Sequence, residues 1–243
     1  MSTLQTYLEF DLAIHPDVVE LLYSRQVPKN NDYWKGRKTF LSQSPGYLFI
    51  PILFDLFLKS NLDKVLSETH LLLIEEILHS AAKQEANQIT NIQHQQECHS
   101  ILSRVGISEK EISRIENSLV KRPFSNFPAK YKSLQRANSY LYSTALFPHD
   151  YDMIFTHWES VMPLFLFLDD LTDLQDDIDT QSENCLLDSP GIENNFFELH
   201  PLFIKSIKPL EKINKNIYLE LNRLRQEGIA ATLGETILTI TLS

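Results

Sequence analysis

The stretch Pro163–Asp179, PLFLFLDDLTDLQDDID, joins two kinds of sequence that rarely meet within one helix. Its first six residues are apolar, and six of the eleven residues that follow are aspartate. An uninterrupted apolar run indicates a helical segment that is buried on every face. A helix that passes directly from the protein interior into a block of negative charge needs something that offsets this charge.

The aspartates have helical spacing. On a continuous helix Asp169, Asp173 and Asp177 lie four residues apart on one face, and Asp170 borders that face. Residues 163–202 contain no Lys or Arg, and half-buried carboxylates without a cationic partner have raised pKa values and cost stability. Carboxylate oxygens are ligands that Mg²⁺ prefers, so these four residues are predicted metal ligands. The alternative interpretation is an acidic helix end that is simply solvated.

The rest of the chain reads as one helix after another. Only 6 of the 243 residues are glycine, and patterns typical of strands are scarce. We therefore predict an all-α fold, a single helical bundle of about eight to ten helices in one domain that spans residues 1–243. The expected helices are Asp17–Gln26, Tyr47–Lys59, Ser67–Gln96, Ser108–Lys121, Tyr131–Phe147, Tyr151–Asp179 and two between Leu202 and Thr239. The longest linker, SENCLLDSPGIENN, is expected before the last two helices.

Composition limits the classes of function. A net charge of -10 argues against a general nucleic-acid surface, because phosphate binding needs clustered Lys and Arg. The two cysteines, Cys98 and Cys185, show no metal or redox spacing, which favours a reducing, cytoplasmic location. The first twenty residues lack the pattern of a signal peptide, and the apolar stretches are too short or too interrupted for a transmembrane segment.

The segment FLFLDDLTDLQDD resembles the second aspartate-rich motif of trans-prenyl diphosphate synthases, Phe-Gln-x-x-Asp-Asp-x-x-Asp-x-x-x-Asp. Phe165 and the four predicted metal ligands fall on this pattern, and Leu166 replaces the glutamine. The same run is similar to the Asp-x-x-x-Asp element of squalene and phytoene synthases, which share the all-helical isoprenoid synthase fold. The resemblance places the chain in the class I terpene synthase superfamily.

Three weaker similarities lie upstream in the order that the family has. EILHSA, Glu76–Ala81, is similar to the stretch that leads into the first aspartate-rich motif, and STALF, Ser143–Phe147, is similar to a Lys-Thr-Ala-x-Leu-Phe element. KGRKTF, Lys35–Phe40, is similar to a basic element that grips diphosphate. Two departures stand out: Ala86–Thr90 has no acid where the first motif would fall, and Ser143 replaces the lysine.

The resemblance implies a function. It implies a Mg²⁺-dependent terpene synthase or prenyltransferase that ionises an allylic prenyl diphosphate, with a homodimer as the common assembly. It assigns substrate binding to Arg37, Lys38, Thr144 and Phe165.

Two other functions stay open at this stage. Because the first motif is missing, the alternative is a catalytically inactive prenyl-synthase-like subunit or a helical interaction protein. The pair Glu76 and His79 has the Glu-x-x-His spacing of a ferritin-like di-iron oxidase, although no second copy of that pair occurs. HQQECH, His94–His99, is interpreted as an exposed polar helix end.

Overall fold

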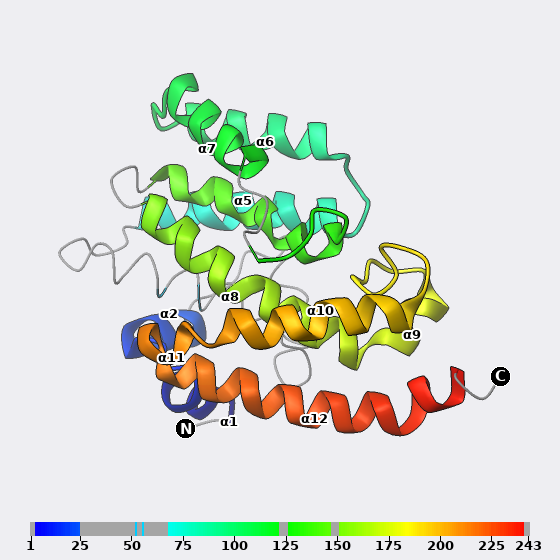
Figure 1. Ribbon diagram of the computed structural model, residues 1–243. Helices are drawn as coiled ribbons and strands as arrows, with labels where there is room; N and C mark the ends of the chain where they lie inside the picture. Colours follow the sequence, from blue (N-terminus) through cyan, green and yellow to red (C-terminus); the bar gives the residue numbers. More distant parts are fainter. Residues whose placement is uncertain are drawn as a thin grey trace.

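The protein is built from helices. The computed structural model describes residues 3–24, 52, 55, 68–121, 126–146 and 151–240, and every regular element in these ranges is helical (Figure 1). The predicted all-α fold is confirmed. The expected helix Tyr47–Lys59 lies outside the described residues, except for positions 52 and 55. No helix within the described ranges is sufficiently long and apolar to cross a lipid bilayer.

The helices have the following bounds. Near the N-terminus are α1 (Thr3–Thr6), η1 (Tyr7–Asp11), a π-helix, and α2 (Pro16–Ser24). The middle of the chain holds α5 (Glu68–Glu85), α6 (Asn91–Ser103), α7 (Glu109–Lys121) and η3 (Lys132–Leu146), a 3₁₀ helix. The remainder comprises α8 (Tyr151–Thr172), α9 (Leu174–Thr180), α10 (Ile192–Ile207), α11 (Leu210–Ile213) and α12 (Lys215–Ile240).

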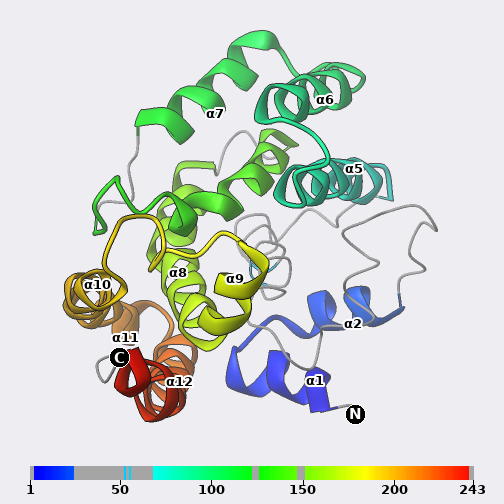
Figure 2. The same cartoon turned by 90° about the vertical axis from the view of Figure 1, so that its right-hand side faces the viewer.

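Helix α8 is the central element of the core. It packs against η3 on one side and against α10 and α12 on another. Every residue from 161 to 168 is buried, as expected for the apolar run that leads into the aspartates. Figures 1 and 2 show α6 and α7 at one end of the molecule and α1 with α12 at the other. The buried apolar residues form one continuous cluster. That residues 1–243 make up a single domain stays a prediction.

The expected continuous helix Ser67–Gln96 is wrong, because the chain turns at residues 86–90 between α5 and α6. Asn87 takes the left-handed conformation, with φ at 54°, which Asn tolerates better than most residues. Thr90 then begins α6 with a capping box, since its side chain accepts from the backbone of Gln93 and the Gln93 side chain bonds back to Thr90.

The expected helix Tyr151–Asp179 is also interrupted, at Asp173, where α8 gives way to α9. The Thr172 hydroxyl donates to the carbonyl of Leu168 at 2.9 Å, a contact that tends to bend helices. Downstream, α10 begins at Ile192, inside the expected linker and ten residues earlier than predicted.

Two expectations agree closely with the structure. Helix α7 follows Ser108, whose hydroxyl accepts from the backbone of Glu111 at 3.3 Å, and Tyr131–Phe147 corresponds to η3.

The N-terminal segment contacts the last helix: the Tyr7 hydroxyl donates to Glu220 on α12 at 2.6 Å. Arg223 donates to the same carboxylate, so that the buried Glu220 has a counter-charge.

Candidate functional site

The aspartate-rich segment borders an open cleft of about 380 Å³. Its walls come from the turn between α5 and α6, from η3, from the end of α8, and from α9 with the loop that follows it. The lining residues are Asn87, Arg136, Asp169, Asp173, Asp177, Thr180, Gln181, Ser182 and Glu183. We call this the acidic cleft, because the described residues of its lining include four carboxylates and one basic side chain, Arg136.

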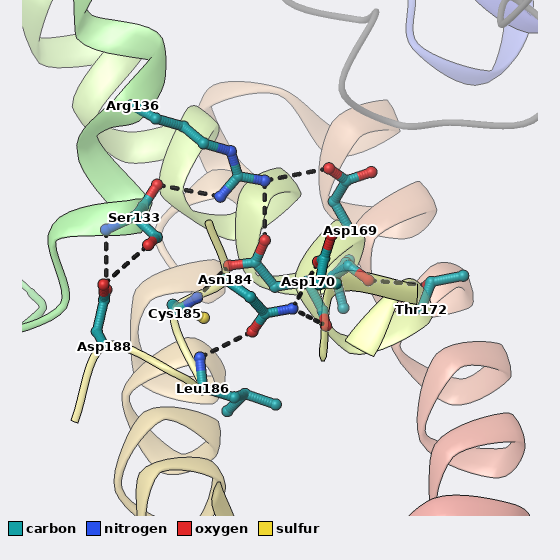
Figure 3. Close-up of polar contacts among 11 residues, drawn as sticks. Ser133, Arg136, Asp169, Asp170, Thr172, Asn184, Cys185, Leu186 and Asp188 are labelled. Carbon is teal, nitrogen blue, oxygen red and sulfur yellow. Dashed lines mark hydrogen bonds and ion pairs between the residues drawn. The ribbon is translucent and has the colours of Figure 1, made fainter. Parts of the chain in front are cut away.

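Arg136 is the counter-ion that the sequence did not reveal. Its Nη2 donates to Asp169 Oδ2 at 3.1 Å and lies 2.8 Å from Asp170 Oδ1, while Nη1 donates to the Ser133 carbonyl (Figure 3). Arg136 lies on η3, 33 residues before Asp169, so that no local pattern connects the two. Arg136 therefore offsets part of the charge of Asp169 and Asp170, and the assignment of these residues as metal ligands stays a prediction.

Asp170 differs from its neighbours because it is buried, with 1% of its side chain exposed. Burial raises the pKa of its carboxyl, while the charge of Arg136 and a 2.7 Å hydrogen bond from the Cys185 amide act in the opposite direction. Burial acts to lower the pKa of Arg136, but the negative charges of Asp170 and Asp169 outweigh it and raise that pKa. Removal of one partner from a buried pair typically costs about 3 to 5 kcal/mol, so this pair ties η3 to α8.

Asn184 holds the loop after α9 against the break at Asp173. Its amide nitrogen donates to the Asp170 carbonyl at 2.7 Å and to Asp177 Oδ2 at 2.9 Å. Its oxygen accepts from the amide of Leu186 at 2.9 Å. Asn184 thus connects the last turn of α8 with a carboxylate on α9. Sequence reasoning missed it, because a single Asn in a turn-rich linker carries no specific signal.

Asp173 is the carboxylate of the cleft that lacks a partner. It sits at the break between the helices with φ at −100° and ψ at 9°, and its side chain caps neither helix. Its side chain is half-buried and makes no hydrogen bond or ion pair with any described residue, although its backbone amide donates to the Asp169 carbonyl at 2.9 Å. Burial, together with the negative charges of Asp169 and Asp177, raises its pKa to about 6. The cleft therefore contains more negative charge than the described residues offset.

The carboxylates of the acidic cleft suit a magnesium ion whose other ligands are waters and phosphate oxygens. Among the described residues, no three His, Cys, Asp or Glu side chains converge closely enough to enclose an ion. Mg²⁺ seldom needs such a cage, because it is usually bound through one or two carboxylates, waters and substrate phosphates. Asp169, Asp173 and Asp177 supply carboxylates of this kind along one wall.

The two predicted substrate-binding residues that the structure describes, Phe165 and Thr144, lie away from this cleft. Phe165 is fully buried in α8, and the buried Thr144 donates its hydroxyl to the Leu141 carbonyl at 2.6 Å. Neither residue lines the acidic cleft. Arg37 and Lys38 lie outside the described residues. Of the eight predicted site residues, the structure brings Asp169, Asp173 and Asp177 to the cleft and places Asp170 directly behind them.

The other predicted polar clusters have structural partners. Glu76 is exposed and forms an ion pair with Arg104. A ligand of a buried di-iron site would instead lie inside the bundle. His94, expected to be exposed, is fully buried: Ser80 Oγ lies 2.9 Å from Nδ1 and the Ser139 carbonyl 3.1 Å from Nε2. Burial lowers the pKa of His94. We call His94, Ser80, Ser139 and the adjacent Cys98 the His94 cluster.

Comparison of the chain with protein-family models, with curated proteins and with solved structures finds no match. The chemistry of the acidic cleft is thus the basis for a proposed function.

Proposed function

We propose that the chain is a Mg²⁺-dependent class I isoprenoid-synthase-like protein whose acidic cleft binds the diphosphate of an allylic prenyl diphosphate. The observation that supports it best is Asp173, a half-buried carboxylate without a partner among the described residues and with a pKa near 6. A carboxylate kept in that state is stabilised by a cation, and strongly perturbed groups in clefts are common at functional sites.

A second observation supports the same proposal from the opposite wall. The turn at residues 86–90 stands where the resembled family has its first aspartate-rich motif, and Asn87 of this turn lines the acidic cleft. Two segments about eighty residues apart therefore face one cleft in the arrangement that the resemblance implies. Asn87 offers a neutral oxygen there in place of a carboxylate.

The residues of the cleft have distinct roles in this proposal. Bound Mg²⁺ would neutralise the diphosphate and make it a better leaving group. Asp169, Asp173 and Asp177 would hold the ion, with waters and phosphate oxygens completing its shell. Arg136 contributes a fixed positive charge at the same wall, and its bond to Asp170 keeps it in position.

The first test is binding. Millimolar Mg²⁺ with inorganic pyrophosphate should raise the melting temperature of the full chain, since a ligand that binds only the folded state stabilises it. Asp173→Asn should abolish this response. Asp179→Asn is the matched control, because Asp179 belongs to the same acidic run but is exposed and outside the cleft lining. An unchanged wild-type melting curve contradicts the proposal.

The second test separates an enzyme from a catalytically inactive relative. The absence of an acid at Asn87 and the engagement of Asp169 by Arg136 favour a protein that binds prenyl diphosphate without turning it over. Release of diphosphate from geranyl, farnesyl or geranylgeranyl diphosphate, lost in Asp173→Asn, indicates an enzyme. Binding without release, together with co-purification of a larger synthase, indicates the inactive subunit.

The opposite wall allows a gain-of-affinity test. Asn87→Asp adds a carboxylate to the cleft at a left-handed backbone position that Asp also tolerates. We expect tighter Mg²⁺ binding in the presence of pyrophosphate, by about tenfold, because an additional ligand charge strengthens binding of a hard cation. Isothermal titration calorimetry measures the change, and Asn194→Asp, at an exposed site on α10, is the control. Equal affinities in wild type and Asn87→Asp would place the ion elsewhere.

A further inference from the structure

The loop after α9 carries a buried amide at the back of the acidic cleft. Asn184 is 2% exposed, and its amide group donates on both sides of the break at Asp173. One acceptor, the Asp170 carbonyl, belongs to the last turn of α8, and the other, Asp177 Oδ2, belongs to α9. Figure 3 shows the Asn184 side chain turned toward Asp170 from the returning loop.

Because Asn184 is an uncharged donor, it leaves the negative charge of Asp177 in place. Arg136 pairs with Asp170 and offsets its negative charge. An amide has no charge, so Asn184 fixes the direction of the Asp177 carboxylate and leaves its full charge to the cleft. A lysine at this position would cancel the charge that a cation needs, and it could not accept from the Leu186 amide.

The loop around Asn184 is itself held in place. The Cys185 amide donates to Asp170 at 2.7 Å, and the Ser182 amide donates to the Asp177 carbonyl at 2.9 Å. Because the Asn184 oxygen accepts from Leu186, its side chain has no free rotation. A rigid donor beside a carboxylate is the arrangement that orients a metal ligand, and mutation of such donors typically costs 10 to 100-fold in affinity.

We propose that Asn184 is the positioning residue of the acidic cleft: it fixes the angle between α8 and α9 and aims Asp177 at the bound cation. This inference rests on the proposed function for its ligand. Asn184 makes no contact with substrate in this scheme, and its effect passes through Asp177.

The test compares two buried asparagines. Asn195 on α10 has the same 2% exposure and donates to the carbonyls of Leu186 and Ser189, neither of which lines the cleft, whereas Asn184 donates to the lining residue Asp177. Asn184→Ala and Asn195→Ala should lose similar stability in urea unfolding. In calorimetric titrations with Mg²⁺ at fixed pyrophosphate, Asn184→Ala should bind about 10 to 100-fold more weakly, and Asn195→Ala within about twofold of wild type.

The outcomes separate the two proposals. Equal affinities in Asn184→Ala and Asn195→Ala overturn the positioning role, whereas a wild-type protein that does not bind Mg²⁺ with pyrophosphate overturns the proposed function. A double-mutant cycle then tests the contact itself without ligand: Asn184→Ala and Asp177→Ala should have non-additive effects on unfolding. Asn195→Ala and Asp177→Ala should be additive, and additivity in both cycles rejects the link between Asn184 and Asp177.

Discussion

The acidic cleft and the His94 cluster are both polar groups set against the apolar core, yet their hydrogen bonding differs. In the His94 cluster each ring nitrogen has a partner, Ser80 on one side and the Ser139 carbonyl on the other. In the acidic cleft one arginine faces four carboxylates, and Asp173 has no partner among the described residues. Complete pairing serves the fold, while an excess of like charge indicates a place for a ligand.

The largest effect is expected at the buried ion pair behind the cleft. Arg136→Met should lower the free energy of unfolding by about 3 to 5 kcal/mol, because Asp170 is left as a buried charge without its counter-ion. Urea unfolding at pH 7 measures this loss. The double variant Arg136→Met with Asp170→Asn should recover much of it, since the uncharged amide can still accept from Cys185. If Arg136→Met unfolds at the wild-type urea concentration, the pair does not tie η3 to α8.

A smaller effect is expected in the His94 cluster. His94→Ala should cost about 2 to 3 kcal/mol, because it creates a cavity and leaves the buried groups of Ser80 and Ser139 without a partner. The response to Mg²⁺ and pyrophosphate should be unchanged, as measured by the melting-temperature shift. If a folded His94→Ala variant lost that response, the His94 cluster would also contribute to ligand binding, and the contrast with the acidic cleft would be wrong.

The smallest effect is expected at Asp173 and should have the opposite sign. Its pKa is raised from 3.8 to about 6, so the folded protein retains a proton that the unfolded chain releases between these values. Wild-type stability should therefore fall as the pH rises from about 4 to 6, and full repulsion remains above that range. Asp173→Asn should gain about 0.5 to 1 kcal/mol at pH 7, since each like-charge pair costs a few tenths.

The pH dependence supplies the control for this prediction. The gain from Asp173→Asn should vanish below about pH 3, where the aspartate is protonated in both the folded and unfolded states. The exposed Asp179→Asn should leave the unfolding curve nearly unchanged at both pH values. A stability loss in Asp173→Asn at pH 7 would mean that the carboxylate has a partner in the fold.

Local patterns predicted the helices where each signal lay within a few residues. The apolar run before Asp169 indicated a buried helix, and the expected helix Ser108–Lys121 corresponds to α7, which starts directly after Ser108; both predictions are confirmed. The break between α5 and α6 had the same kind of signal, since Thr90 and Gln93 fit a capping box. It was missed because the apolar spacing of the flanking residues continued the helical period across the turn.

Contacts between distant residues could not be predicted in the same way. The even spacing of the aspartates suggested four equivalent ligands, but Arg136 and Cys185 withdraw Asp170 into the interior. Neither partner belongs to the acidic run, and only the packing of η3 against α8 brings Arg136 to it. His94 was expected to be exposed for the same reason, because its burial depends on Ser139 of η3.

The bond between Tyr7 and Glu220 joins residues that are 213 positions apart. A ribosome therefore releases the N-terminal segment long before its partner on α12 exists, and Tyr7 has to wait for the last helix to emerge. Contacts between residues this far apart in the sequence slow folding, because the loop between them has to close before the contact can form. Chains that stop before residue 220 would leave the two termini unjoined.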